Sequence, residues 1–345
     1  MNHVAAGHGP PLLEVRNLVK HFPVRRTWAE ALRRAPPAAI RAVDDISFSV
    51  ATGSTLALVG ESGCGKTTTG RCILFLQQPT AGEVIVKGER VDPGDAAGMR
   101  QWRKQLQIVF QDPNSSLNPR MTIGQTLGEA LLFHKMIEGR QRDEAVAELL
   151  ETVGLSGRQS GRYPNELSGG QRQRVGIARA LAVNPELIVA DEPVSALDVS
   201  VQAQILQLLE RLRDERGLAY LFISHDLGVV RHISDAVAVM YLGVIVERAP
   251  TAALYGRPLH PYTRALLAAA PVPNPRLRRT RAPIMGDPPS ALAPPSGCRF
   301  RTRCPYAEAR CAAETPPLRE LEAGHWVACH FAEAIDAGGR AAPAV

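Results

Sequence analysis

At 345 residues the chain can form one large domain and an appendage, and its 45% hydrophobic and 5% aromatic content is that of a globular protein. Its net charge of +6 is mild, with no Lys/Arg run of the kind that marks a nucleic-acid-binding tail. The longest apolar stretch, residues 236–246, is too short for a membrane span, which needs about 20 residues. Residues 1–11 have neither a basic start nor an apolar segment, so we expect no signal peptide and a cytoplasmic protein.

The N-terminal region predicts two strands, at residues 13–22 and 43–50, the second with apolar residues alternating in period two. Between them, residues 25–41 are basic and contain Ala and Pro, which predicts a surface loop. An amphipathic membrane-facing helix is the alternative there, but Pro36 and Pro37 would cut it short.

Short apolar strand candidates follow at residues 55–59, 187–190, 220–224 and 236–242, separated by helical patterns such as 201–213. This rhythm is typical of a parallel sheet covered by helices on both faces.

Residues 122–182 break this rhythm, because they contain helix formers such as 143–150 and no strand candidate. We therefore predict an inserted helical subdomain. From residue 257 the composition shifts to a proline-rich connector at 283–295 and then a separate cysteine module.

Residues 60–67, GESGCGKT, fit the phosphate-binding pattern G-x-x-x-x-G-K-[ST] and lie between a strand and a probable helix. The glycines let backbone N–H groups face phosphates, and the helix N-terminus adds a favourable dipole. We expect Lys66 to reach the β- and γ-phosphates of ATP and Thr67 to ligate Mg²⁺. Cys64 fills space in the loop, and we expect it to be open to alkylation, with a bulky adduct blocking ATP.

A second element of the site is the apolar strand candidate that ends in Asp191, followed by Glu192. We expect the carboxylate of Asp191 to lie beside the phosphate-binding loop and hold Mg²⁺, directly or through water. Glu192 is then positioned to polarise the attacking water as general base.

Residues 167–175, LSGGQRQRV, resemble the signature motif of the ABC ATPases, and other motifs of that family stand in the expected order. Gln111 in VFQD resembles the Q-loop glutamine, Asp198 closes a run similar to the D-loop, and His225 in SHD resembles the switch histidine. The resemblance implies an α/β fold with a P-loop NTPase (RecA-like) core, an N-terminal antiparallel β subdomain and an inserted helical subdomain.

The resemblance also implies a nucleotide-sandwich dimer, in which the signature motif of one subunit covers ATP on the P-loop of the other. Ser168, Gly169 and Gly170 would open a helix and supply a second phosphate-binding N-terminus. His225 is implied to contact the γ-phosphate and hold the catalytic water with Glu192. Gln111 is implied to contact Mg²⁺ or water and to couple the ATP state to membrane subunits.

An aromatic residue of the N-terminal sheet stacks on the adenine ring in this family, and Phe22 is our candidate. The predicted ATP-binding residues are Phe22, Gly60, Ser62, Gly63, Cys64, Gly65, Lys66, Thr67, Thr68, Ser168, Gly169, Gly170, Gln171 and Asp198; the catalytic candidates are Glu192, His225, Lys66 and Gln111; and the candidate Mg²⁺ ligands are Thr67, Gln111 and Asp191.

Residues 110–122, FQDPNSSLNPRMT, and residues 260–267, HPYTRALL, resemble segments of the oligopeptide, dipeptide and nickel importer ATPases. Residues 105–122 are more similar to the second, "F"-type, of two paralogous ATPases, which implies a heterodimer, with a homodimer as the alternative. The expected domains are an ATPase domain at 1–256, with its helical subdomain at about 112–182, and a C-terminal extension at 257–345 that holds the cysteine module 298–330.

Four cysteines form this module, with spacings of five, six and 17 residues that differ from a zinc-ribbon C-x₂-C pair: Cys298, Cys304, Cys311 and Cys329. In a reducing compartment such clustering favours metal over disulfides. Four thiolates suit either Zn²⁺ or an iron–sulfur cluster. Relatives with this extension can carry a 4Fe–4S cluster, which would staple the module without a redox role; zinc, or reduced cysteines that pack the module, are the alternatives. His330 adjoins the last cysteine and could replace a ligand.

Together these features predict an ATP-hydrolysing subunit that energises an ABC importer of peptides, with nickel or another small solute as the alternative cargo. Its expected partners are a second ATPase subunit, two membrane permease subunits that hold it at the cytoplasmic face of the membrane, and, indirectly, an extracytoplasmic solute-binding protein. A soluble ABC ATPase acting on ribosomes or DNA is disfavoured, because the sequence has one P-loop and no nucleic-acid-binding insertion. An inert regulatory partner is disfavoured by the intact Lys66, Asp191, Glu192 and His225.

Overall fold

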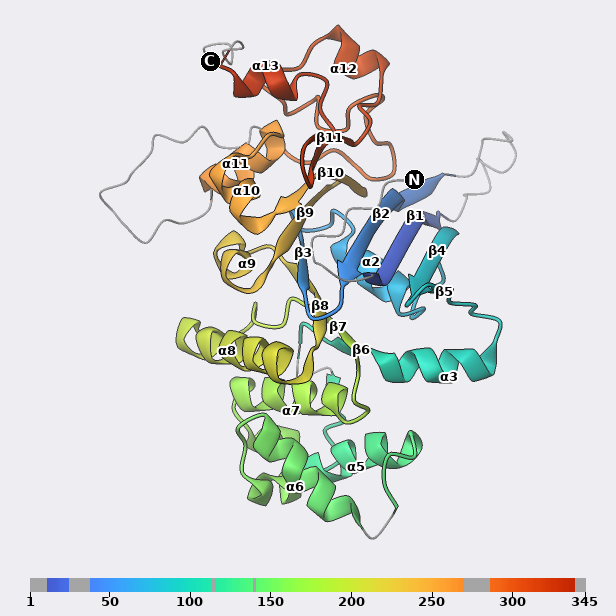
Figure 1. The fold of residues 1–345 in the computed structure, drawn as a ribbon, viewed down its shortest axis with the longest axis vertical. Helices are drawn as coiled ribbons and strands as arrows, with labels where there is room; N and C mark the ends of the chain where they lie inside the picture. Colours follow the sequence, from blue (N-terminus) through green and yellow to red (C-terminus); the bar gives the residue numbers. More distant parts are fainter. Residues whose placement is uncertain (1–10, 25–37, 113–115, 139–140, 270–285, 339–345) are drawn as a thin grey trace. The chain divides into compact units, whose positions relative to one another are not determined.

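The computed structural model describes residues 11–24, 38–112, 116–138, 141–269 and 286–338 (Figure 1). The chain forms two compact units, the first made of residues 1–49, 56–90 and 224–345 and the second of residues 50–55 and 91–223. These units divide the chain differently from the boundary expected at residue 256, which stays a prediction. Within the described part of the chain, no helix is both long and apolar enough to cross a membrane.

An antiparallel sheet in the first unit has the strand order β2-β1-β4-β5. Strand β1 pairs with β4, with Leu13 opposite Val86, and β4 pairs with β5. This sheet confirms the predicted antiparallel subdomain. Its strands are β1 (Pro11–Pro23), β2 (Ala39–Ala51), β4 (Ala81–Val86) and β5 (Glu89–Arg90).

Strand β2 begins at Ala39, four residues before the predicted start, so the predicted surface loop at 25–41 is wrong at its C-terminal end. In the early part of β2, Ile40 and Arg41 are exposed, and the alternation of buried and less buried residues begins only at Ile46, continuing at Phe48 and Val50. Residues 25–37 lie outside the described residues.

A second sheet of the first unit joins the strand before the P-loop to the C-terminal region. Strand β3 (Thr55–Val59) pairs in parallel with β9 (Ala236–Tyr241), and β9 pairs antiparallel with β10 (Val244–Pro250). Strand β10 then pairs with β12 (His325–Val327), and β12 with β11 (Arg319–Glu322).

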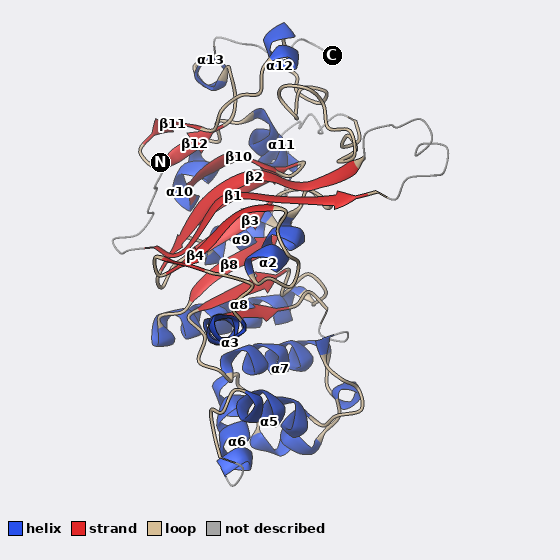
Figure 2. Cartoon of the chain, turned by 90° about the vertical axis from the view of Figure 1, so that its right-hand side faces the viewer, coloured by secondary structure: helices blue, strands red, loops and turns tan. Residues whose placement is uncertain are grey.

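The sequence led us to expect a separate cysteine module. The structure differs, because β12 of this module extends the same sheet (Figure 2). A buried apolar cluster made of Leu259, Val327, Cys329, Ala332 and Ile335 packs the module against the start of the C-terminal extension. The helices of the first unit are α2 (Lys66–Ile73), α9 (Leu227–Ile233), α10 (Thr251–Gly256), α11 (Pro261–Ala269), α12 (Ala309–Ala313) and α13 (Ala332–Asp336).

The second unit contains three parallel strands, in which β7 lies between β6 and β8. Residues 116–182 contain helices and no strand in their described part, as predicted, and α5, α6 and α7 pack on one another. The elements are β6 (Leu106–Val109), β7 (Leu187–Asp191), β8 (Ala219–Ser224), α3 (Ala96–Gln105), α5 (Ile123–Phe133), α6 (Arg142–Thr152), α7 (Gly169–Leu181) and α8 (Val199–Arg216), with short 3₁₀ turns at Gly157–Gly161 and Pro164–Glu166.

Buried polar residues fasten the C-terminal extension to β10. The Glu247 carboxylate accepts hydrogen bonds from the backbone N–H groups of Leu259 (2.7 Å) and His260 (3.0 Å) and lies 2.7 Å from Nε2 of His325. Burial opposes its ionisation, but these hydrogen bonds prevail and lower the pKa of Glu247. His260 is also buried, and its Nδ1 accepts a hydrogen bond from the N–H of Tyr262 (3.0 Å).

Because His260 is buried, protonation should destabilise the fold. Burial lowers the pKa of His260 to about 4, whereas the unfolded value is 6.5, so the unfolded chain binds an additional proton between these pH values. We expect the free energy of unfolding to fall by about 2 kcal/mol from this residue between pH 7 and pH 5.

The measurement is urea unfolding of the wild type and His260→Asn across this pH range. Asparagine retains an acceptor for the N–H of Tyr262 but cannot titrate, so the difference between the two pH slopes isolates His260. Equal slopes in the two proteins would contradict the assignment.

Candidate nucleotide-binding site

The P-loop, residues 60–67, runs from the end of β3 into the first turn of α2, and glycines make its path feasible. Gly65 has φ +109°, and a Cβ atom there would lie 2.1 Å from the carbonyl oxygen of Ala42. Gly60 has φ +153°, and a Cβ atom there would lie 2.2 Å from the carbonyl oxygen of Met240. These close approaches to β2 and β9 leave room for backbone alone.

Lys66 lies inside this loop, buried except for 5% of its surface. Its Nζ donates hydrogen bonds to the carbonyl oxygens of Gly60 (2.8 Å) and Glu61 (3.0 Å), which holds the ammonium group within the loop. The first turn of α2 contains no acidic residue, so its N-terminal N–H groups suit an anion. Around them, Ser62 and Gly63 are exposed, whereas Thr67 and Thr68 are half-buried.

The prediction that Cys64 is open to alkylation is wrong. Its side chain is 4% exposed, and burial raises the pKa of the thiol, which disfavours the reactive thiolate. Its carbonyl oxygen accepts a hydrogen bond from the N–H of Gly243 (2.9 Å) in the turn between β9 and β10. Cys64 is therefore a packing residue between the P-loop and the turn that joins β9 to β10.

Sequence reasoning missed two residues that hold Glu61, the second residue of the P-loop, and a third that packs against them. Its N–H donates to the hydroxyl oxygen of Tyr262 (2.9 Å), and its carboxylate accepts two hydrogen bonds from Arg303 (2.7 and 3.0 Å). Tyr241 completes this group, with its ring centroid 4.7 Å from that of Tyr262. The alternating arginines between the first two cysteines were the available signal, but they do not identify a partner.

In the second unit, Asp191 ends β7 and is buried, and Glu192 follows with φ +47°. Left-handed backbone is uncommon outside glycine and clusters at functional sites. The N–H of Glu192 donates to the carbonyl oxygen of Ile223 (2.9 Å), which fixes this turn. Nε2 of Gln111 donates to Oε2 of Glu192 (2.9 Å), so the structure brings together two of the predicted catalytic residues.

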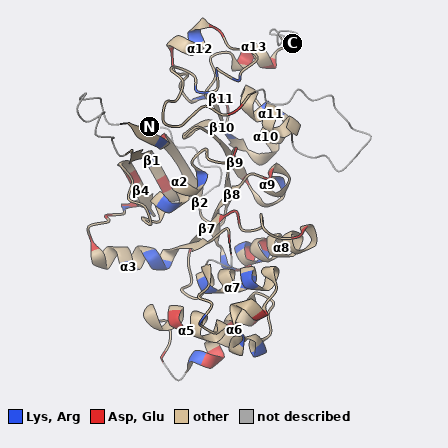
Figure 3. Cartoon of the chain, turned by 180° about the vertical axis from the view of Figure 1, so that it is seen from behind, with Lys and Arg blue, Asp and Glu red and all other residues tan. Residues whose placement is uncertain are grey.

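The signature motif opens α7, as predicted. Ser168 is the N-cap: its Oγ accepts from the N–H of Gln171 (3.3 Å), and its own N–H donates to Oε1 of Gln171 (3.0 Å). A Cβ atom at Gly170 would lie 2.4 Å from Cγ1 of Val201, so glycine lets α7 approach α8 closely. Gly169 is half-buried and Ser168 exposed. The rest of α7 carries the arginines Arg172, Arg174 and Arg179 among buried apolar residues (Figure 3).

Three further candidates lie on the surface or at its edge. His225 is exposed directly after β8, before the Asp226 carboxylate that caps α9 through the N–H of Gly228 (2.7 Å). Asp198 is exposed at the start of α8, where its side chain makes no capping hydrogen bond. Phe22 is half-buried near the end of β1, with Nζ of Lys20 4.9 Å from its ring centroid. Their roles at the nucleotide stay predictions.

Comparison with known proteins identifies this arrangement. Residues 43–195 match the ABC transporter family, and residues 246–311 match the oligopeptide/dipeptide transporter C-terminal region. The chain is 54% identical over 319 residues to the probable peptide ABC transporter ATP-binding protein y4tS of Sinorhizobium fredii, covering 92% of this chain and 89% of that protein. It is 50% identical over 331 residues to the oligopeptide transport ATP-binding protein AppF of Bacillus subtilis, covering 95% and 99%.

The chain belongs to the ABC transporter ATP-binding proteins, within the oligopeptide/dipeptide transporter family. It is an ABC-type ATPase coupled to transport, as predicted. Among solved structures, the dimeric MJ0796 cassette in a post-hydrolysis state with ADP and Pi aligns with a TM-score of 0.60 at 30% identity, covering 69% of this chain and 98% of that one. The P-loop NTPase fold class is thereby confirmed.

In this ATPase the four cysteines of the C-terminal module are free thiols that line one cavity, which has room for about one water molecule (about 10 Å³). Burial raises the pKa of Cys298, that of Cys304 to about 12 and that of Cys329 to about 11, and the neighbouring thiols contribute in the same direction. Within the described residues, no three His, Cys, Asp or Glu side chains are arranged to hold a metal ion. His330 instead lies 3.0 Å, through Nε2, from the carbonyl oxygen of Glu314.

The close approaches at the P-loop make a stability prediction. Gly65→Ala places a methyl group 2.1 Å from a backbone oxygen, whereas Gly63→Ala, also at positive φ (+79°), meets nothing within 4 Å. Both variants strain the backbone, but Gly65→Ala alone must also displace β2. We expect Gly65→Ala to lower the free energy of unfolding by at least about 2 kcal/mol more than Gly63→Ala. Chemical denaturation without nucleotide measures this difference, and equal losses would refute the packing argument.

Proposed function

We propose that this ATPase powers the import of peptides. The observation that carries the proposal is the combination of an ABC cassette with the oligopeptide/dipeptide transporter C-terminal region in one chain. The relatives y4tS and AppF, whose names specify peptide and oligopeptide transport, align over more than nine-tenths of this chain. Import of nickel or another small solute is the alternative, because the cargo contacts other subunits.

In the proposed reaction water attacks the γ-phosphorus of ATP in line with the leaving ADP oxygen. Glu192 accepts the proton of this water, and the hydrogen bond from Gln111 fixes its carboxylate. Lys66 exchanges its bonds to the loop carbonyls for phosphate oxygens, and His225 holds the γ-phosphate and the water. Catalysis then depends mostly on positioning and on stabilising negative charge.

The residues suit Mg²⁺, which when bound neutralises phosphate charge. Asp191 offers a carboxylate that is 3% exposed, a position that a buried charge occupies when it has a cation or hydrogen bonds to stabilise it. Thr67 adds a hydroxyl in the first turn of α2 and Gln111 an amide oxygen, so the donors are the oxygen ligands that Mg²⁺ prefers. We propose these three as its ligands.

For assembly we propose a nucleotide sandwich with a second ATPase subunit, either a paralogue or a second copy. Ser168 to Gln171 and Asp198 would then face ATP on the partner's P-loop. MJ0796, 30% identical to this chain, is a dimer in the solved structure. Two permease subunits would hold the pair at the cytoplasmic face of the membrane, with a solute-binding protein on the other side and no nucleic acid involved.

For the cysteine module we propose a 4Fe–4S cluster held by Cys298, Cys304, Cys311 and Cys329. Four thiols from separate segments line one cavity, and burial raises the pKa of three of them, those of Cys298, Cys304 and Cys329. The cluster would supply positive iron for all four thiolates and link the segments. The thiols would have to separate to admit it, because the cavity is small. Zinc and reduced thiols are the alternatives.

The catalytic proposal predicts the behaviour of Glu192→Gln. The substitution should lower ATP turnover by at least about 100-fold with ATP binding retained, because it removes the general base. Glu215→Gln, an exposed substitution on α8, is the control and should keep wild-type turnover.

A pull-down tests the proposed assembly. Tagged Glu192→Gln held with ATP should recover a second ATPase and two integral membrane proteins from native membranes. Unchanged turnover would refute the role of Glu192, and recovery of ribosomes or DNA alone would refute the importer.

The cluster proposal predicts about four iron and four acid-labile sulfide per chain in protein purified without oxygen. Cys304→Ser should lose this iron, whereas Cys72→Ala, a buried cysteine of α2, should retain it. One zinc per chain, or no metal in either protein, would refute the cluster in favour of its alternatives.

A further inference from the structure

The turn between the first two cysteines of the C-terminal module reaches the P-loop. Arg303 directly precedes Cys304, and its N–H donates to the carbonyl oxygen of Phe300 (3.0 Å) within this turn. The guanidinium group forms a bidentate ion pair with the carboxylate of Glu61, with two hydrogen bonds of 2.7 and 3.0 Å. The Arg303 side chain is 5% exposed and that of Glu61 25%, so water screens this pair weakly.

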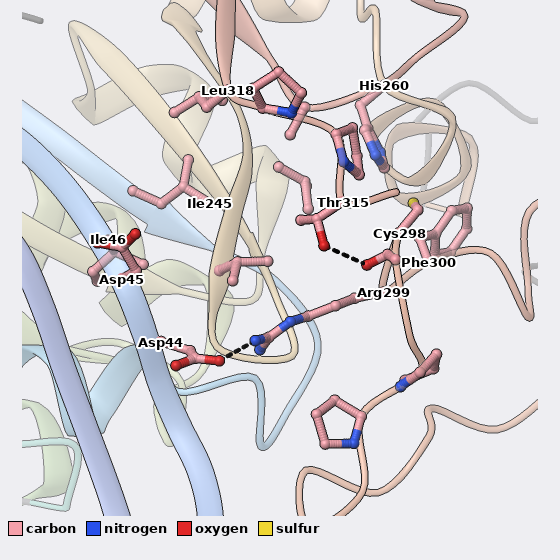
Figure 4. A pocket seen from close by; sticks show the side chains of 18 of the residues that line it. Asp44, Asp45, Ile46, Ile245, His260, Cys298, Arg299, Phe300, Thr315 and Leu318 are labelled. Atoms are coloured by element: carbon pink, nitrogen blue, oxygen red, sulfur yellow. Dashed lines mark hydrogen bonds and ion pairs between the residues drawn. The ribbon is translucent and has the colours of Figure 1, made fainter. Parts of the chain in front are cut away.

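The surroundings of the pair make its geometry rigid. Cζ of Arg303 lies 5.8 Å from the ring centroid of Tyr241, and the Tyr241 and Phe300 rings meet edge to face at 5.2 Å. On the other side of the turn, Arg299 forms an ion pair with Asp44 of β2 beside a cavity of about 570 Å³ (Figure 4). Arg299 also donates to the carbonyl oxygen of Leu242 in the turn between β9 and β10. The turn is thus anchored to the strands that surround the P-loop.

Electrostatics gives the pair a consequence for ATP. Glu61 lies in the loop that must accept a triphosphate, and an uncompensated carboxylate there would repel it. A guanidinium group is always protonated and matches a carboxylate with two parallel hydrogen bonds, which makes it an effective neutralising partner. The N–H of Glu61 is also held by Tyr262, so residues of the C-terminal extension fix both its backbone and its charge.

We propose that Arg303 is a positioning residue for the P-loop, which neutralises Glu61 and makes ATP affinity depend on the C-terminal module. ATP binding at this P-loop follows from family membership. The proposal is independent of the peptide cargo and of whether the thiols hold a cluster.

The test is direct titration of the full-length protein with MgATP. Arg303→Gln should raise the Kd for ATP about tenfold, because it leaves the carboxylate of Glu61 unpaired beside the phosphates. Turnover at saturating ATP should stay within about twofold of wild type, so that KM rises with little change in kcat. Arg310→Gln removes an exposed arginine of the same module that pairs with Glu314, and it should bind ATP as the wild type does.

Charge rescue separates neutralisation from general packing. Adding Glu61→Gln to Arg303→Gln should restore most of the lost affinity, and Glu61→Gln alone should bind ATP at least as tightly as the wild type. The single Glu61→Gln variant shows whether the charge of Glu61 weakens ATP binding, even if Arg303→Gln folds poorly. Wild-type affinity in Arg303→Gln, no rescue in the double variant, or weakened binding by Glu61→Gln would each overturn the proposal. The titration measures ATP affinity alone, so its outcome does not depend on the peptide cargo or on the role of Glu192 in hydrolysis.

Discussion

The close approach of the P-loop to the strands beside it is the constraint on which the first unit depends. A loop that turns its N–H groups toward phosphate needs left-handed backbone, and here it also runs against the carbonyl oxygens of Ala42 and Met240, where a Cβ atom at Gly65 or Gly60 would collide. The loop therefore has the required shape only while β2 and β9 stay in place. Phosphate binding therefore requires the packed sheet. The glycine pattern of the P-loop reflects the close packing of this loop against β2 and β9.

Sequence predicted the elements whose signals are local. Largely apolar strands such as β3 and β7, and the helix start at Ser168, are specified by neighbouring residues, and the structure places them as expected. Strand β10 was missed because an apolar run continues across Leu242 and Gly243, whose positive φ values (43° and 82°) turn the chain into a hairpin. The burial of Cys64 was missed for a related reason: the motif fixes the backbone path, but the packing of the neighbouring turn decides which side chain is covered.

The same division between local sequence signals and long-range packing holds for the candidate site. The motifs locate Lys66, Asp191, Glu192 and the signature helix, because each stands at the end of a strand or the start of a helix, where phosphate and metal ligands gather. The contact between Glu61 and Arg303 joins residues 242 positions apart, and no pattern in either segment indicates it. Such long-range pairs arise from the way the C-terminal extension packs on the sheet, so they become visible only in three dimensions.

A buried carboxylate on β10 attaches the C-terminal extension to the rest of the ATPase. Glu247 is fully buried on β10, and its hydrogen-bond partners come from Leu259, His260 and His325, all supplied by the extension. A buried carboxylate without partners is strongly destabilising, so β10 could not keep Glu247 if the extension were absent or displaced. The same requirement holds β12 against β10 and, through it, the cysteine module that carries Arg303. A single acidic residue in the sheet thus commits the C-terminal region to a fixed position, and that fixed position is what allows its arginine to reach the P-loop.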